Sequence, residues 1–198
     1  MKKEDMTRDE MYRLLPELCL IENAKLRETC ADVWIEALEA GGWFEKDGWG
    51  KFPFSVTLRD DCPENLLTHT GQVALTSLAI YDSLAPVRRR VGECSRDTVL
   101  AGALLHDVGK LLEYDLDAEG RSCNSRTAKK FRHPVWSYYF AQKHGMHEDI
   151  VHLVLTHSSF FSPEGANAYR TAESIIVKAS DSLCYQYVDK FYARAKED

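Results

Sequence analysis

Three ionisable side chains interrupt an apolar segment near the middle of the chain. The segment reads VLAGALLHDVGKLLEY from Val99 to Tyr114, with His106 beside Asp107 and Lys110 four residues after the histidine. A carboxylate in such a run is costly to bury unless it is paired with a cation or bound to a metal. These residues alone fit a metal site and a helix end with a satisfied core histidine equally well, so the rest of the chain must decide.

Four further polar residues stand in or beside apolar helical runs elsewhere in the sequence. They are His69 in NLLTHTGQVAL, His133 in KFRHPVWSYY, His157 in VLTHSSFF and Asp181 in IIVKASDSLCY. One such residue is usually a satisfied core side chain, but five such positions in one small helical chain favour a metal cluster. Imidazole combined with carboxylate suits Fe, Mn, Co or Zn better than Mg alone.

The chain also carries three histidines that we do not assign to a cluster. His144 and His147 are expected to be exposed at helix ends, and His152 is expected to lie on a different helical face from His157. These three show that histidine is frequent in this chain, so its presence alone identifies no ligand.

The elements that must position these residues are predicted to be helices, because apolar residues recur at helical spacing and strand signals are nearly absent. Ser95 is a candidate N-cap for the helix that carries the 99–114 segment. The other predicted helices span 20–40, 65–84, 134–143, 148–157 and 171–194. The 115–131 stretch is polar and without period, and we interpret it and the 158–170 stretch as loops. The predicted fold class is all-α.

The aromatic stretch from Trp43 to Phe54 leaves two interpretations open. Its glycines and rings predict an ordered, irregular loop that packs either into the core or over the mouth of a pocket, where it would form a lid or stack on a nucleobase. Core packing is the favoured interpretation. The Arg88–Arg90 run is interpreted as a solvated face.

Composition places limits on the class of protein. The chain has 198 residues, of which 44% are hydrophobic, and no linker-like stretch divides it, which predicts one domain. Six scattered cysteines without a CxxC pair indicate reduced thiols, and no signal peptide or membrane span is recognised, so a cytoplasmic protein is expected. The net charge of −6 argues against a dedicated duplex-DNA binder and leaves room for a small phosphorylated substrate.

The order of these residues resembles a known family. The pattern His69…His106-Asp107…His133…His157…Asp181, with LLHDVGK at its centre, is similar to the HD superfamily of metal-dependent phosphohydrolases in its two-metal form. The contexts LLTHT, HLVLTHS and SDSL look most like the HD domain of 3′-to-5′ exoribonucleases and related stand-alone hydrolases. The resemblance covers roughly 66–187, and it implies a helical HD core at about 63–190 preceded by a helical extension at about 7–62.

The resemblance implies a role for each matching residue. His69, His106, Asp107 and Asp181 would hold one divalent metal, and Asp107 would also bridge to a second metal held by His133 and His157. A metal-activated hydroxide would then attack phosphorus, with Asp107 and Lys110 as the catalytic residues and Lys110 also contacting a phosphate oxygen. The metals expected are Fe or Mn, with Zn, Co or Mg as alternatives. For Lys110 the other interpretation is a surface lysine after a helix end.

Departures from the exonuclease pattern shape the expected substrate. Those enzymes carry a nucleic-acid-binding barrel, for which this chain has no room, and several of them have two histidines where this chain has His157-Ser158. We therefore expect a nucleotide or another small phosphoester, in preference to a nucleic acid. Arg126, Lys129, Lys130 and Arg132 precede His133, and they either contact phosphate at the rim of the site, chiefly through Lys130 and Arg132, or belong to a solvated loop.

Two other function classes compete with a phosphohydrolase. HD proteins that resemble inositol oxygenase and the phosphonate-cleaving oxygenases hold a mixed-valent di-iron pair and use O₂ to cleave a small polar substrate. A ligand-sensing module without catalysis is the third alternative, and it is disfavoured because all six candidate ligands are present.

Overall fold

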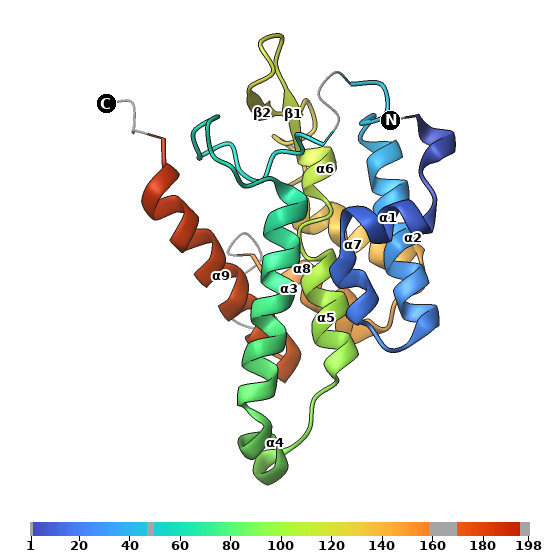
Figure 1. Ribbon diagram of the computed structural model, residues 1–198, viewed down its shortest axis with the longest axis vertical. Helices are drawn as coiled ribbons and strands as arrows, with labels where there is room; N and C mark the ends of the chain where they lie inside the picture. Colours follow the sequence, from blue (N-terminus) through green and yellow to red (C-terminus); the bar gives the residue numbers. More distant parts are fainter. Residues whose placement is uncertain (1, 47–49, 159–169, 195–198) are drawn as a thin grey trace.

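The computed structural model of the protein describes residues 2–46, 50–158 and 170–194 and is mostly helical, which confirms the all-α prediction (Figure 1). The α-helices are α1 (Arg8–Leu14), α2 (Ala24–Ala40), α3 (Leu66–Ser83), α4 (Ala85–Val91), α5 (Arg96–Leu105), α6 (Lys110–Glu113), α7 (His133–Lys143), α8 (Glu148–Thr156) and α9 (Ala172–Tyr192). Short 3₁₀ helices, η1 (Lys3–Asp5) and η2 (Pro16–Leu20), lie near the N-terminus, and strands β1 (Tyr114–Leu116) and β2 (Ser122–Asn124) form a small hairpin.

Side-chain caps begin the helices that carry the chemistry. Asn65 accepts hydrogen bonds from the backbone N–H groups of the first turn of α3, and Ser95 and Thr171 do the same for α5 and α9. These helix starts were predicted, as were the limits of α7 and α8 to within a residue. Most of the predicted 158–170 loop, residues 159–169, lies outside the described residues.

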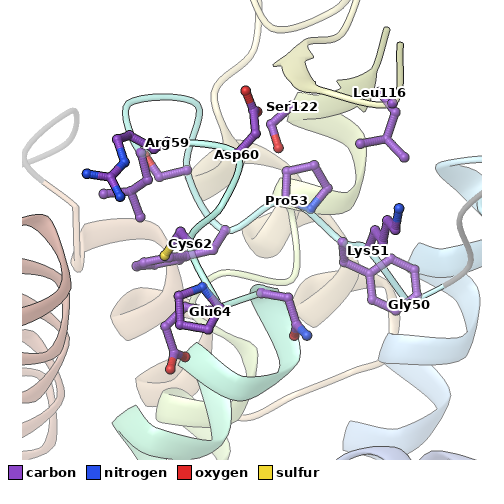
Figure 2. A pocket seen from close by; sticks show the side chains of 16 residues that line it. Gly50, Lys51, Pro53, Arg59, Asp60, Cys62, Glu64, Leu116 and Ser122 are labelled. Atoms are coloured by element: carbon purple, nitrogen blue, oxygen red, sulfur yellow. The ribbon is translucent and has the colours of Figure 1, made fainter. Parts of the chain in front are cut away.

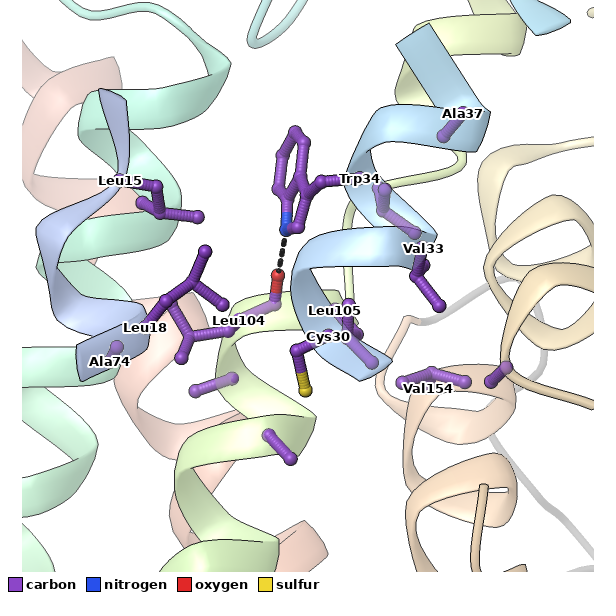
Figure 3. Packing of buried hydrophobic residues seen from close by; sticks show 14 of the residues in the cluster. Leu15, Leu18, Cys30, Val33, Trp34, Ala37, Ala74, Leu104, Leu105 and Val154 are labelled. Carbon is purple, nitrogen blue, oxygen red and sulfur yellow. Dashed lines mark hydrogen bonds between the residues drawn. The ribbon is translucent and has the colours of Figure 1, made fainter. Parts of the chain in front are cut away.

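The core is built where α5 passes between the other helices. α3 packs against both α5 and α9, α7 packs against α8, and η2 and α2 cover α5 from the N-terminal side. The indole of Trp34 is fully buried and its Nε1 donates to the Leu104 carbonyl over 2.9 Å (Figure 3). The N-terminal helices therefore share one hydrophobic core with the later ones, while the proposed boundary near residue 63 stays a prediction.

The aromatic stretch packs into this core at its first residues, as favoured from the sequence. Trp43 is fully buried and donates its Nε1 to the Leu111 carbonyl over 2.7 Å. Phe52 meets the Trp43 ring edge-on at a centroid distance of 5.3 Å. The second tryptophan of the stretch, Trp49, lies outside the described residues.

Two sequence-based boundaries were wrong. The first predicted helix begins at Ala24 and not at residue 20, because Asn23 caps it and the preceding residues form η2. The 115–131 stretch is not all loop, because Tyr114–Leu116 pairs antiparallel with Ser122–Asn124.

The 99–114 segment is broken at its charged residues. α5 ends at Leu105, and the backbone turns through 106–109 before α6 begins at Lys110. Gly109 makes this turn fit, because a Cβ atom built there would lie 2.1 Å from the carbonyl oxygen of His133. The backbones of the turn and of α7 therefore approach more closely than any side chain would permit.

Two other expectations concern the surface and the thiols. All six cysteines are free, as predicted. Within the part of the chain that the structure describes, no helix is both long enough and apolar enough to cross a bilayer. Arg89 and Arg90 on α4 are exposed, whereas Arg88 is half-buried and its guanidinium lies over the ring of Tyr81.

Candidate metal centre

Five separate elements each bring one part of the candidate site to the middle of the molecule. His69 lies in the first turn of α3, the 106–109 turn follows α5, and Asp181 lies halfway along α9. His133 begins α7, and His157 directly follows the last residue of α8. The described structure therefore brings all six predicted ligand residues together, although they span more than half of the sequence.

The first group consists of His69, His106, Asp107 and Asp181, whose ligand atoms all lie within 4.8 Å of one another. The Nε2 atom of His69 is 3.4 Å from Asp107 Oδ2 and 3.2 Å from Asp181 Oδ1. The Nε2 atom of His106 is 3.3 Å and 3.6 Å from the same two oxygens. Two nitrogens and two oxygens thus face one common point.

The second group shares Asp107 with the first. The Oδ1 atom of Asp107 lies 3.2 Å from His133 Nε2 and 3.5 Å from His157 Nε2, and these two imidazole nitrogens are 3.3 Å apart. Asp107 therefore presents Oδ2 to one group and Oδ1 to the other. A carboxylate in this position has the geometry needed to bridge two cations.

Hydrogen bonds at the far side of three imidazoles orient their Nε2 atoms inward. His106 Nδ1 lies 2.6 Å from the Ala103 carbonyl, and His157 Nδ1 lies 2.8 Å from the Val154 carbonyl. Each of these Nδ1 atoms donates to a carbonyl one turn earlier in the chain. A partner of this kind fixes both the ring orientation and the proton position of a metal-binding histidine.

The third of these imidazoles depends on a residue that the sequence did not single out. His133 donates both its backbone N–H and its Nδ1–H to Glu113, the latter over 2.7 Å, and the Glu113 side chain is fully buried. Arg132 Nε lies 2.6 Å from the other oxygen of this carboxylate. Glu113 therefore orients His133. Its place three residues after Lys110, at the polar end of an apolar run, is the one sequence signal that pointed to it.

The electrostatics of the cluster favour a cation at its centre. Burial lowers the pKa of His106, but the carboxylates of Asp107 and Asp181 outweigh burial and raise it to about 10. Burial raises the pKa of Asp107, yet the Lys110 ammonium and His106 hold it well below its usual range. For His133, burial is the larger effect and lowers the pKa to about 4, which leaves a neutral imidazole. The carboxylates thus draw positive charge into the site.

Lys110 lies inside the site and is not a surface residue. Its Nζ is 2.6 Å from Asp107 Oδ2, and 8% of the residue is exposed. Burial lowers the pKa of this ammonium, but the nearby Asp107 carboxylate more than compensates and the pKa is raised. Lys110 thus carries a fixed positive charge next to both groups of ligand atoms.

Phe54 closes one side of the cluster. Its ring stacks on the imidazole of His69 at a centroid distance of 3.9 Å, and Lys110 Nζ lies 4.8 Å from the centre of the same ring. Phe54 also lines a hollow of about 310 Å³ between the 50–65 segment and the hairpin, to which Leu116 and Ser122 contribute (Figure 2). One end of the aromatic stretch therefore contacts the candidate site, while its start belongs to the core.

The remaining predicted residues lie near the site but not within it. Lys130 is exposed, and Arg132 directs its guanidinium to Glu113 behind His133, so substrate contact by either residue stays a prediction. His147 is exposed, as expected, and His152 is absent from both groups. His144 was expected to be exposed, which was wrong: its Nε2 lies 2.7 Å from Glu36 of α2, and this packing shields the side chain from solvent.

The donor set fits divalent metal ions. Ligand atoms separated by 3.2–3.6 Å have the spacing expected around one ion with bonds of about 2.0–2.2 Å. The Nε2 atom of His106 is also buried without a hydrogen-bond partner among the described residues. Buried polar atoms are nearly always satisfied, so this unsatisfied nitrogen is accounted for if it binds a metal.

Comparisons with known proteins match the part of the chain that contains the six candidate ligands. The sequence model of the HD-domain family matches residues 66–186, more than half of the chain. Ribonuclease Y of Acidothermus cellulolyticus is 28% identical over 116 residues, which make up 59% of this chain and 20% of that protein. Ribonuclease Y of Thermotoga maritima is 26% identical over 120 residues, or 61% of this chain and 18% of that protein. The chain thus spans about a fifth of the length of these relatives, and no solved structure matches it significantly.

Proposed function

The chain belongs to the HD-domain family, and from that premise we propose that it is a phosphohydrolase with a two-metal site. The family and the ribonuclease relatives support a metal-dependent hydrolase in general. The finer proposal is that the enzyme hydrolyses a phosphomonoester or phosphodiester bond in a nucleotide or another small phosphorylated substrate.

The position of Asp107 is the observation that carries this proposal. Its two oxygens face two different groups of ligand atoms, which is the arrangement that would let one carboxylate hold two cations. In the proposed site, His69, His106 and Asp181 complete the first metal position. His133 and His157 complete the second.

Metal ions held in this way supply two effects when bound, the acidification of a water molecule and the stabilisation of charge on the phosphoryl oxygens. The protein side chains do the rest. Lys110 keeps its proton on Nζ and donates it as a hydrogen bond to an oxygen of the phosphoryl group, which favours anionic substrates. Phe54 excludes water from the face of His69 on which it stacks. Glu113 holds the Nδ1 proton of His133, so that His133 Nε2 keeps a free electron pair for its metal.

The decisive experiment combines metal analysis with a substrate panel. We expect anaerobically purified protein to bind two equivalents of metal per chain and, with Mn²⁺, to release phosphate or a phosphomonoester from a nucleotide or a generic small phosphodiester. The panel should contain mononucleotides, cyclic dinucleotides, phosphonates and a short RNA, the last because the relatives are ribonucleases.

Two results would contradict the proposal. Turnover that requires O₂, together with iron and a spectral change on exposure to air, would assign the site to the di-iron oxygenases. A chain that binds one metal or none would remove the two-cation role of Asp107.

A further inference from the structure

The positive charge of the protein is unevenly distributed along the chain. The stretch 120–147 contains six of the 25 Lys and Arg residues and none of the 31 Asp and Glu residues. The rest of the protein is therefore more acidic than the net charge of −6 suggests. A local cationic stretch in an acidic protein concentrates anionic ligands at one place on its surface.

Three aromatic rings follow one another along the outside of the same stretch. The ring centroids of Phe131 and Trp136 are 5.6 Å apart, and those of Trp136 and Tyr139 are 6.2 Å apart. Phe131 and Tyr139 are each 46% exposed, and Trp136 is half-buried between them. Exposed aromatic rings that adjoin one another form an apolar patch, and such a patch next to charged residues is typical of a surface that binds a partner.

Positively charged side chains flank the three rings at both ends, but only those that precede Phe131 in the sequence are without an acidic partner among the described residues. Arg126, Lys129 and Lys130 are exposed and form no ion pair with any described residue. At the opposite end, Lys143 pairs with Glu36 of α2. The surface available to an anion therefore runs from the three cations over Phe131 and Trp136 to Tyr139, and we call these six residues the α7 surface.

We propose that the α7 surface binds single-stranded nucleic acid. Unpaired bases expose faces that stack on aromatic rings, while the phosphates that join them pair with Lys and Arg, and sequence-independent binding of single strands combines these two interactions. A duplex hides its base faces and would use the cations alone. An acidic peptide would likewise leave the rings unused. This proposal does not depend on the metal centre, because none of the six candidate ligands belongs to the α7 surface.

The test measures binding of fluorescently labelled ten-nucleotide RNA and DNA strands to the full chain by anisotropy. We expect saturable binding that weakens with salt, and a matched duplex that binds at least about tenfold more weakly. The Arg126→Glu/Lys129→Glu variant should bind at least about tenfold more weakly than wild type. The slope of log K against log salt should become shallower by about 0.7 for each phosphate that the variant no longer neutralises.

The matched control reverses the same number of charges elsewhere. Arg89 and Arg90 are exposed on α4 without an ion pair to described residues, and Figure 1 shows α4 at the opposite end of the molecule from the hairpin. Arg89→Glu/Arg90→Glu should leave binding unchanged to within about twofold. An equal loss of affinity in the two double variants would mean that net charge alone explains the binding, and it would overturn the proposal.

A second variant isolates stacking from charge. Tyr139→Leu keeps an apolar side chain and every cation, and removing one stacking ring should lower the affinity by about tenfold. An unchanged affinity, a duplex bound as tightly as the single strand, or equal competition by poly-glutamate would each overturn the proposal. The phosphohydrolase proposal is judged separately. If the wild-type protein hydrolyses a small phosphoester but binds no single strand, only the proposal for the α7 surface is contradicted. If it binds single strands but hydrolyses no phosphoester, only the phosphohydrolase proposal is contradicted.

Discussion

Leu104 and His106 stand two residues apart at the end of α5 but belong to regions with opposite physical properties. Leu104 is fully buried in the apolar core, where its carbonyl accepts the indole N–H of Trp34. His106 is equally buried but faces two carboxylates. The core stabilises the fold through the apolar surface that it removes from water. The metal centre places charges where they are costly, and the surrounding helices must hold them there.

This difference predicts which measurement each region controls. A substitution in the core should change the free energy of unfolding and leave metal binding intact. A substitution in the metal centre should change metal binding and turnover and leave the helices intact. Variants in the apolar core and variants in the candidate metal centre therefore test whether stability and metal binding are controlled independently.

The largest effect is expected from Asp107→Ala. Because one carboxylate faces both groups of ligand atoms, this variant should bind neither metal and should lose at least about 10³-fold in turnover. Circular dichroism should show most of the helical signal retained. Two equivalents of bound metal in this variant, measured by elemental analysis, would mean that Asp107 bridges nothing.

Trp34→Ala is the matching change in the core. The loss of a fully buried indole should lower the free energy of unfolding by about 3–5 kcal/mol, measured by urea denaturation of the metal-free protein. Metal stoichiometry in the folded fraction should stay at the wild-type value. A selective loss of metal without a loss of stability would show that the two regions are coupled through α5.

Lys110→Met separates charge from packing inside the site. The methionine fills the space over the Phe54 ring but cannot donate to a phosphoryl oxygen, so turnover should fall by about 10²-fold. Metal content should change little. Unchanged kinetics for this variant would exclude Lys110 from the reaction.

Glu113→Gln tests a residue that binds no metal itself. Its amide can still accept the Nδ1 proton of His133 but lacks the charge, so the affinity for the second metal should weaken by about 10- to 100-fold. Titration with Mn²⁺ should show one site weakened and one unchanged. His133→Ala removes the ligand itself and therefore gives the largest loss of affinity expected at the second metal site. Glu119→Gln, on the exposed hairpin, serves as the control that should leave both affinities unchanged.

The smallest effect is expected at Glu36, where α2 meets the end of α7. Burial raises the pKa of this carboxyl, but hydrogen bonds from Lys143 and His144 outweigh burial and lower it. A lowered folded-state pKa stabilises the protein above the pKa of the unfolded chain, and this stability is lost as the pH falls through the folded value. Glu36→Gln should therefore cost about 0.2–1 kcal/mol at pH 7, and the difference from wild type should vanish in acid. A pH-independent difference would contradict this assignment.

Much of the fold followed from local signals in the sequence. Asn65, Ser95 and Thr171 are capping residues before apolar periodic runs, and each begins a helix as predicted. The break after Leu105 was not predicted, because the residues on both sides are apolar and helix-forming and the turn depends on the close approach of Gly109 to α7. The hairpin at 114–124 was missed because its strands are three residues long and carry no alternating pattern.

The candidate site shows the same division between local and tertiary information. The six proposed ligands were found because polar residues in apolar runs require partners, and the structure brings them together. The positions of Glu113 behind His133 and of Phe54 against His69 depend on packing between elements distant in the sequence. Phe54 breaks no local pattern, and Glu113 is marked only by its place at the polar end of an apolar run, so the sequence alone did not reveal the role of either residue.

The stacking of Phe54 on His69 has a practical consequence. Phe54 lies twelve residues before the start of the family match at residue 66, so a fragment trimmed to the matched region would retain every proposed ligand while exposing one imidazole face to bulk solvent. Fragments designed around the family match should accordingly begin upstream of Trp43, so that the Phe54 ring stays with the residues of the candidate metal centre.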